Sequence, residues 1–322
     1  MEAARKHSGI LFFGSPDFAI PSLKALIGSE YRPDLVFTQP DRRKGRGRKT
    51  APTPVRKVAE EEGLPVRIIG SFREEGILDF LESLDPVYLV VVAFGLIFPS
   101  RALRAASKAN INLHASLLPA YRGASPINAA IVNGERDTGV TTMEMVEELD
   151  AGPIYLQRRV AIDSEENAGD LSKRLAEEGA LLLLETLRGL EAGTIEPREQ
   201  PSEGISIARR LRKEDGLIDW SLEAVAVHDH IRGMHPWPGS YTYHGGNYLR
   251  ILRSRVESRE GGTEPPGTVL RAAPDGIVVA CGSGTVGVTR IQASGRKALD
   301  VEEFLNGYAV GRGERLGRED VR

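Results

Sequence analysis

The sequence predicts an α/β protein, in which a parallel sheet with helices on both faces is followed by a small β-barrel domain. In the first two thirds, short apolar runs alternate with helical stretches, which is the pattern of a parallel sheet covered by helices. Beyond residue 207, short β-like runs are separated by Gly and Pro, as in a small barrel. The length of 322 residues suits two domains of roughly 150 residues each.

The first domain is expected to alternate strands and helices in a regular order. Its helices are predicted from helical stretches between the apolar runs, the first with Ser15 as N-cap and Pro16 at its first position. The apolar run at 87–92 predicts the central buried strand. The predicted strands are 10–13, 35–38, 66–69, 87–92, 111–113, 138–145 and 154–160, and the helices are 16–27, 54–62, 74–84 and 171–190.

A polar, irregular stretch between 194 and 210 has the composition of a linker. It divides the chain into a first domain over 1–193 and a second over 211–322. After it, a helix at 222–234 is expected to precede the strands of the barrel. Those strands are predicted at 241–243, 249–255, 267–270, 277–280 and 286–291.

Composition excludes several classes of protein. Hydrophobic residues make up 41% and charged residues 27% of the chain, which are ordinary values for a globular protein. No apolar window is long enough to span a bilayer, and the N-terminal residues lack the apolar core of a signal peptide, so neither export nor membrane insertion is expected. Cys281 is the sole cysteine, which excludes an internal disulfide and a thiolate zinc site, and a reducing cytoplasm fits best.

One short segment is strongly basic although the chain has a net charge of −3. Between Arg42 and Lys49 it carries six positive and no negative charges, and two glycines within it disfavour a stable helix. A run of this kind is often only a solvated loop. Because concentrated positive charge attracts phosphates, contact with nucleic acid is the favoured interpretation.

One glycine motif is expected to have no nucleotide-binding role. Gly282, Gly284 and Gly287 match the G-x-G-x-x-G pattern of dinucleotide sites, but they lie between two predicted strands of the second domain. The motif requires a strand before it and a helix opening at it. A β-hairpin turn is therefore predicted, and no bound nucleotide is expected.

Asn112 and His114 are the first candidate pair for chemistry. They are two residues apart at the end of a predicted strand, so their side chains point to the same face. Ligands of parallel sheets bind beyond the carboxyl ends of the strands, where this pair emerges. An Asn in a turn beside an ordinary buried histidine would be the structural alternative, and the pairing favours the functional interpretation.

Asp150 follows in the loop between the two predicted strands at 138–145 and 154–160. The loop could be a plain β-turn, since Asp, Gly and Pro all suit one. Beside Asn112 and His114, however, Asp150 would complete an acid, a base and an oxyanion donor for acyl transfer without a metal. His228 and His230 lie two apart on a predicted helix and face different directions, which argues against a metal pair.

At these residues the chain resembles the folate-dependent formyltransferases. Asn112, His114 and Asp150 match the positions of that family's catalytic residues, and the segment 116–126 is similar to its signature after the histidine. Glu148 and Ala151 depart from the family's pattern around the aspartate. The resemblance extends over nearly the whole chain and implies a Rossmann-like catalytic domain followed by an OB-like domain that binds tRNA.

The resemblance also implies the reactants and their binding residues. The formyl donor would be 10-formyltetrahydrofolate, with tetrahydrofolate as product and neither metal nor nucleotide required, and the acceptor would be the α-amine of methionyl-initiator tRNA. A monomer is expected. The folate-binding residues would be Phe94, Gly95, Leu96, Ile97, Ser116, Leu117, Leu118 and Pro119, and the tRNA-binding residues would be Arg42, Arg43, Lys44, Arg46, Arg48 and Lys49.

Two rival functions stay open at this point. Another branch of the family formylates sugar-nucleotide amines, and the catalytic residues alone do not distinguish the two branches. A non-catalytic RNA-binding protein would be supported by the basic run and the β domain only. The intact set of Asn112, His114 and Asp150 argues against this second rival.

Overall fold

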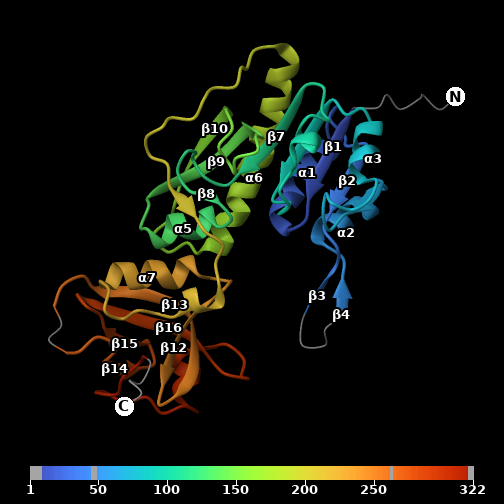
Figure 1. The fold of residues 1–322 in the computed structure, drawn as a ribbon. Helices are drawn as coiled ribbons and strands as arrows, with labels where there is room; N and C mark the ends of the chain where they lie inside the picture. Colours follow the sequence, from blue (N-terminus) through green and yellow to red (C-terminus); the bar gives the residue numbers. More distant parts are fainter. Residues whose placement is uncertain (1–8, 45–48, 262–263, 318–322) are drawn as a thin grey trace. The chain divides into compact units, whose positions relative to one another are not determined.

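The computed structural model describes residues 9–44, 49–261 and 264–317, with only the backbone described for 42–44 and 49–50 (Figure 1). Within these residues, contacts between Cα atoms define two compact units. The first draws on the described residues of 1–123, 139–160 and 172–207, and the second on those of 124–138, 161–171 and 208–322. The division predicted from sequence at 194–210 makes each domain one continuous stretch of chain. Each of these units instead draws on three separate stretches.

The first unit is built on a seven-stranded sheet. Five of its strands run parallel to their neighbours, and β9 is antiparallel to β7. The predicted parallel sheet is confirmed, and β6, which is buried throughout, is its central strand. In spatial order the strands are β10 (Ile154–Ala161), β9 (Asp137–Glu144), β7 (Ala109–His114), β6 (Tyr88–Val92), β1 (Ile10–Gly14), β2 (Leu35–Thr38) and β5 (Val66–Ile68).

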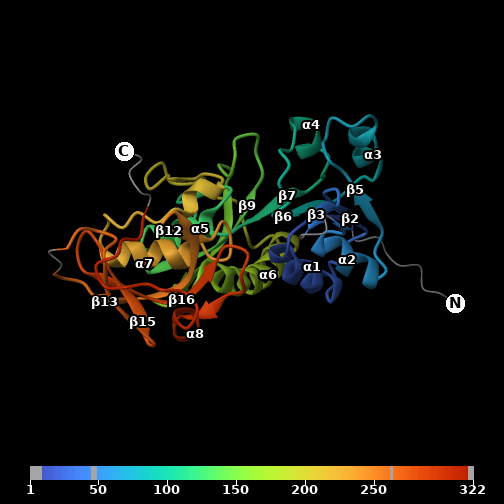
Figure 2. The same ribbon diagram turned by 90° about the horizontal axis from the view of Figure 1, so that it is seen from below.

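Helices cover both faces of this sheet, as predicted. Figure 2 shows α3 (Ile77–Ser83) and α4 (Ser100–Leu103) on one side and α1 (Ile20–Ile27) and α6 (Ala168–Ala192) on the other. The first face is packed by aromatic rings around Phe13, whose centroid lies 4.4 Å from that of Phe37 and 5.1 Å from that of Phe98. On the second face, a Cβ added at Gly179 of α6 would lie 2.6 Å from Leu113 of β7, so glycine permits the close approach of helix to sheet.

The start of the first helix differs from the prediction. A short 3₁₀ turn, η1 (Asp17–Ala19), precedes α1, and Pro16 stands before it as N-cap. Ser15 does not cap the helix. Its Oγ instead accepts a hydrogen bond from the backbone N–H of Gln39 at 3.1 Å and so ties the end of β1 to the end of β2. The Ser15 hydroxyl, which the sequence predicts to cap the helix, therefore bonds to the sheet instead.

The two ends of the basic run lie on a pair of short strands and not in a plain loop. Strands β3 (Arg42–Lys44) and β4 (Lys49–Ala51) pair antiparallel, with Lys44 opposite Lys49 (Figure 1). The chain then enters α2 (Pro54–Glu61), where Thr53 Oγ1 accepts from the N–H of Arg56 at 3.1 Å. Pairing satisfies the backbone groups that the two strands turn towards each other, which holds 42–44 and 49–51 extended.

The second unit contains a six-stranded antiparallel sheet with an apolar core. His244 pairs with Leu316, and Thr268 pairs with Arg315, so neighbouring C-terminal residues join the two sheet edges. The predicted small barrel is thereby confirmed, and Gly282–Gly287 lies in and just after the β15–β16 turn. The strands are β12 (Ser240–His244), β13 (Asn247–Ser258), β16 (Thr285–Ala293), β15 (Gly276–Ala280) and β14 (Val269–Ala273), with β17 (Leu299–Asp300) beside β16.

Two helices of the second unit pack tightly on each other. Helix α5 (Pro126–Val132) lies against α7 (Ala224–Gly233), where Asn128 Nδ2 donates to the carbonyl of Gly233 at 2.7 Å. A Cβ at Gly233 would lie 2.6 Å from a methyl group of Val132.

The remaining short elements of the chain are η2 (Lys213–Gly216), α8 (Val301–Leu305) and the paired strands β8 (Arg122–Gly123) and β11 (Ile207–Ala208). No helix in the described part of the chain is long and apolar enough to cross a membrane.

A fragment ending at residue 193 would keep α5 but lose α7. We expect it to expose Ile131 and Val132 and to lose about 1.5–3 kcal/mol for each apolar side chain left uncovered. It should bind anilinonaphthalene sulfonate more strongly than the full chain, and replacing both residues with Ser should reduce that binding. A fragment that melts like the full chain and ignores the dye would contradict this interpretation.

His230 on α7 predicts a dependence of stability on pH. Its Nε2 is buried without a partner among the described residues, and burial lowers the pKa of the ring below its ordinary 6.5. Because the unfolded chain then binds the proton more readily, the free energy of unfolding should fall as pH drops below about 6.5. His230→Gln should flatten this dependence in denaturant titrations, and an unchanged dependence in this variant would contradict the assignment.

Candidate active site

The end of β7 presents Asn112 and His114 on one face of the sheet. Asn112 lies opposite Val91 of β6 in parallel register and opposite Met143 of β9 in antiparallel register. His114, two residues on, is opposite Thr141. Strand alternation therefore places both side chains on the side that Val91 faces, as predicted. The side-chain amide of Asn112 has no hydrogen-bond partner within the described residues and can donate to a ligand.

His114 is buried, and both of its ring nitrogens face oxygen atoms. Nε2 lies 2.9 Å from the carbonyl oxygen of Tyr121. Since a carbonyl can only accept, Nε2 carries a proton and donates it there. Nδ1 lies 3.6 Å from Oδ2 of Asp150, which is an ion-pair distance when the ring is charged. The backbone at Tyr121 thus fixes the ring and turns Nδ1 towards the carboxylate.

Asp150 is held in a strained backbone conformation at the tip of the loop between β9 and β10. Its φ of +52° lies in the left-handed region that non-glycine residues rarely adopt. Its Oδ2 accepts a hydrogen bond from the backbone N–H of Gly123 at 2.8 Å. The loop can return to β10 because residue 152 is glycine, where a Cβ would lie 1.9 Å from the carbonyl oxygen of Glu144. The structure therefore brings Asp150 to His114, as the sequence predicts.

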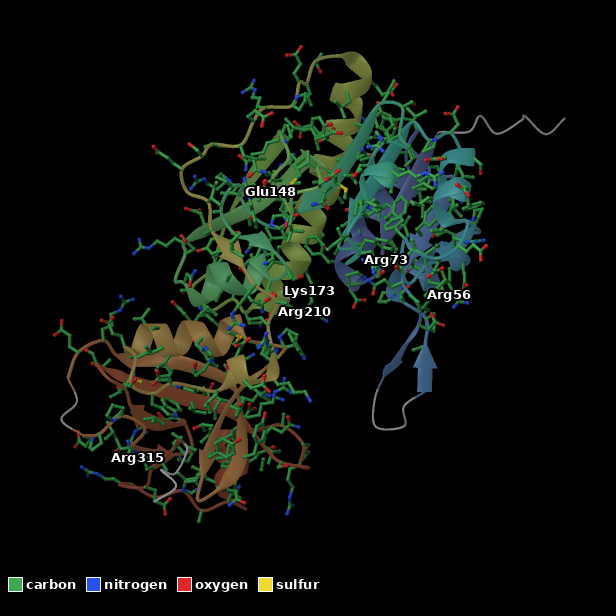
Figure 3. All side chains as sticks on the ribbon, in the orientation of Figure 1. Arg56, Arg73, Glu148, Lys173, Arg210 and Arg315 are labelled. Atoms are coloured by element: carbon green, nitrogen blue, oxygen red, sulfur yellow. The ribbon has the colours of Figure 1, made fainter. Side chains whose placement is uncertain are left out.

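A second layer of hydrogen bonds fixes this loop from a distant segment. Gln200 Nε2 donates to the carbonyl oxygens of Asp150 and Gly152, each at 2.8 Å. Its Oε1 accepts from Arg122 Nε at 3.1 Å and Nη2 at 2.8 Å. Glu148, labelled in Figure 3, lies 3.5 Å from Nη1 of the same arginine. Gln200 was missed from sequence because it stands in the stretch with linker composition, and no local signal separates it from its polar neighbours.

The predicted folate-binding residues fall into two groups. Phe94 is buried and its carbonyl oxygen accepts from Gln39 Nε2 at 2.8 Å, whereas Ile97 is 83% exposed. A cavity of about 810 Å³ is lined by Gly95, Leu96 and Ile97 together with residues between 71 and 79 and Arg101. The exposed isoleucine and this cavity offer a ligand surface in the first unit on which apolar groups lie beside charged ones.

Residues 116–119 form a turn that the sheet holds from within. Thr141 Oγ1 donates to the carbonyl oxygen of Ser116 at 2.7 Å, and Gln157 Nε2 donates to that of Leu118 at 2.8 Å. Leu117 packs on Gly139, where an added Cβ would lie 2.5 Å from its Cδ2. None of Ser116, Leu117, Leu118 and Pro119 lines the cavity of about 810 Å³.

Four of the six predicted tRNA-binding residues belong to the paired strands β3 and β4. Arg42, Arg43, Lys44 and Lys49 lie on these two strands, where the backbone alone is described, and Arg46 and Arg48 lie outside the described residues. Neither His228 nor His230 belongs to a metal-binding cluster, since the described residues contain no group of three or more His, Cys, Asp or Glu able to hold an ion. His228 is instead engaged with Ser254 Oγ at 3.0 Å.

Comparison with known proteins agrees with this fold. Residues 9–187 match the formyl transferase family, and 210–309 match the formyl transferase C-terminal domain. The methionyl-tRNA formyltransferase of Citrifermentans bemidjiense is 43% identical over 312 residues, which cover 97% of each chain.

Solved structures show the same architecture. The N-formyltransferase from Helicobacter canadensis, in complex with folinic acid and dTDP-3-aminofucose, has a TM-score of 0.66 at 18% identity over 88% of this chain and 99% of that one. The methionyl-tRNA formyltransferase from Clostridium thermocellum has a TM-score of 0.52 at 15% identity over 77% and 93%. These two likenesses show the fold alone, whereas the family match covers more than half of the chain. The chain therefore belongs to the formyl transferase family.

Proposed function

We propose that this protein transfers the formyl group of 10-formyltetrahydrofolate to the α-amine of methionyl-initiator tRNA, giving formylmethionyl-tRNA and tetrahydrofolate for translation initiation in the cytoplasm. The observation that carries the proposal is the grouping of Asn112, His114 and Asp150 at the carboxyl end of β7, with Nδ1 of the histidine 3.6 Å from the carboxylate. Its curated relative of 43% identity bears the name of this activity.

The chemistry follows from where charge develops. The uncharged amine attacks the formyl carbon, and the carbonyl oxygen becomes an oxyanion as the new C–N bond forms. The unpartnered amide of Asn112 donates to that oxygen, and a proton on Nδ1 of His114 adds positive charge beside it. The bond to N10 of the folate then breaks, N10 takes up a proton, and the amine nitrogen loses one.

Asp150 has two tasks in this scheme. Its Oδ2, held by the N–H of Gly123, stabilises the charged His114 ring through the ion-pair distance of 3.6 Å. Its Oδ1 makes no hydrogen bond within the described part of the chain and can accept the amine proton through a water molecule. The carboxylate therefore supports both the oxyanion and the departing proton.

The binding residues are assigned on the same proposal. The folate would contact Phe94, Gly95, Leu96 and Ile97 beside the cavity of about 810 Å³, and the turn at 116–119 would shape the reacting end of the site. The basic hairpin would engage the acceptor arm of the tRNA, since its cations can pair with phosphates. The catalytic domain is assigned to 1–193 and the tRNA-binding domain to 211–322, joined by 194–210, and the protein acts as a monomer.

The function is tested by single-turnover formylation of methionyl-initiator tRNA with 10-formyltetrahydrofolate. His114→Ala, Asp150→Asn and Asn112→Ala should each slow the reaction by roughly two to four orders of magnitude, the scale for losing an acid, base or oxyanion partner. His244→Ala, which removes a histidine of the second unit bound to Glu314, serves as the matched control.

Competing acceptors complete this test. Free methionine and sugar-nucleotide amines should be formylated far more slowly than the aminoacyl-tRNA. A preference for a sugar amine would instead assign the protein to the other branch of the family, and near-native rates in the His114 variant would refute its catalytic role.

Gln200 should act as a positioning residue for Asp150. Gln200→Ala removes both bonds to the loop carbonyls, and a small displacement of the carboxylate can lower kcat by up to about 100-fold with little change in KM for tRNA. Gln200→Glu keeps an acceptor for Arg122 but loses both donors, so it should not restore kcat. Ser83→Ala, which removes a single bond to the Phe80 carbonyl in the first unit, is the control. A wild-type kcat for Gln200→Ala would show that the aspartate needs no such support.

A further inference from the structure

Three tyrosines form an aromatic cluster on the outer face of the β12–β13 pair. Tyr243 lies opposite Tyr248, and Tyr241 lies opposite Arg250, so all four side chains project from one face. The rings of Tyr241 and Tyr248 are stacked at 4.9 Å, and Tyr243 meets Tyr248 edge-on at 6.1 Å. Tyr241 is buried beneath the others, whereas Tyr248 is 37% exposed. The cluster presents an aromatic ring to solvent on a rigid aromatic base.

Arg250 places an uncompensated positive charge beside these rings. Its Nη2 donates to the carbonyl oxygen of Pro236 at 2.6 Å, and a Cβ at Gly239 would lie 2.2 Å from the same nitrogen. The guanidinium therefore lies flat against the loop before β12. Its Nε is buried without a partner, and no carboxylate pairs with it within the described residues. The positive charge of Arg250 is therefore left without a carboxylate partner among the described residues.

A further exposed aromatic residue, Trp237, follows Pro236 in that same loop. It is 52% exposed, although a large aromatic side chain is costly to leave in water. The other tryptophan, Trp220, is 4% exposed and its indole N–H bonds to Thr242 Oγ1 at 3.1 Å. One tryptophan thus belongs to the core and the other to the surface. We name Trp237, Tyr243, Tyr248 and Arg250 the aromatic–arginine face.

Further cations lie next to this face. Arg250 is paired in register with Gln292 of β16, whose Nε2 donates to the carbonyl oxygen of Arg296 at 2.8 Å. Arg296 and Lys297 follow in the exposed turn before β17, and Arg253 lies further along β13. No carboxylate forms an ion pair with these three cations in the part of the chain that is described. The surroundings therefore favour an anionic ligand.

We infer that the aromatic–arginine face binds RNA by stacking an unpaired base and holding its phosphate. Exposed rings accept any base by its π face, and a planar guanidinium pairs with phosphate oxygens or stacks on a base. An apolar protein surface would leave these cations unpaired, whereas a nucleotide uses both the rings and the charge. The inference rests on the proposed function, because it takes the tRNA substrate as the RNA that is bound.

Tryptophan emission offers a direct test on the full-length protein. Because Trp220 is buried, quenching by acrylamide reports mainly on Trp237. Uncharged initiator tRNA should protect this emission from acrylamide and should do so less at high salt. Protection that rises with protein concentration and needs no tRNA would mean that a second copy covers the face, and would overturn the inference.

Substitutions separate stacking from simple packing. Tyr248→Leu should weaken tRNA binding roughly 5- to 100-fold and raise KM while leaving kcat near the wild-type value, and Tyr248→Phe should restore binding because the ring returns. Arg250→Ala should reduce the slope of log affinity against log salt by about 0.7 to 0.9, the share of one phosphate. Arg271→Ala, an arginine of the same unit that is already paired with Asp275, is the matched control.

The outcomes also separate this inference from the proposed function. If the wild type formylates methionyl-tRNA but the Tyr248 and Arg250 variants keep its affinity and salt slope, the face does not bind tRNA and the inference fails alone. If the wild type does not formylate methionyl-tRNA, the proposed function fails. Thermal melting near the wild-type temperature for Tyr248→Leu ensures that its loss of binding is not a loss of folding.

Discussion

The hydrogen bond from the Gly123 backbone to the Asp150 carboxylate is the contact on which the candidate active site depends. It holds a non-glycine residue at a φ of +52°, a conformation that costs free energy unless its surroundings impose it. Without this bond, Asp150 would be free to relax away from Nδ1 of His114. The ring itself is fixed from its other side by the carbonyl of Tyr121. The backbone at Tyr121 and Gly123 therefore fixes the positions of both His114 and Asp150.

Support for this arrangement comes from three separate parts of the first unit. Strand β7 supplies His114 and Asn112, the loop after β9 supplies Asp150, and Gln200 joins that loop to Arg122 through four hydrogen bonds. Such a connected set of bonds makes the positions of its members interdependent, because moving one group lengthens the bonds to the next. The amide of Asn112 lies outside the set, which suits a group that is needed only when an oxyanion forms.

The two tryptophans of the second unit have different roles, one in the core and one at the surface. Trp220 satisfies its indole N–H inside the barrel core, while Trp237 stays half in solvent beside Arg250. The buried tryptophan stabilises the fold, and the exposed one offers surface to a ligand. The cations near Arg250 have no carboxylate partners within the described residues. This surface can therefore attract anions although the net charge of the chain is slightly negative.

Sequence by itself determined most strands and helices of both domains, though not α4, α5 or the β3–β4 pair. It also determined the shared face of Asn112 and His114 and the choice of Asp150, because period-two alternation and turn chemistry are local properties. Strand β6 was recognised as central since a fully apolar run fits only a strand buried on both faces. The bond between Gly123 and Asp150, the support from Gln200 and the redirected hydroxyl of Ser15 came only from tertiary structure. Each joins residues 24 to 50 positions apart, and the sequence pattern does not encode which distant polar group will satisfy a given donor or acceptor.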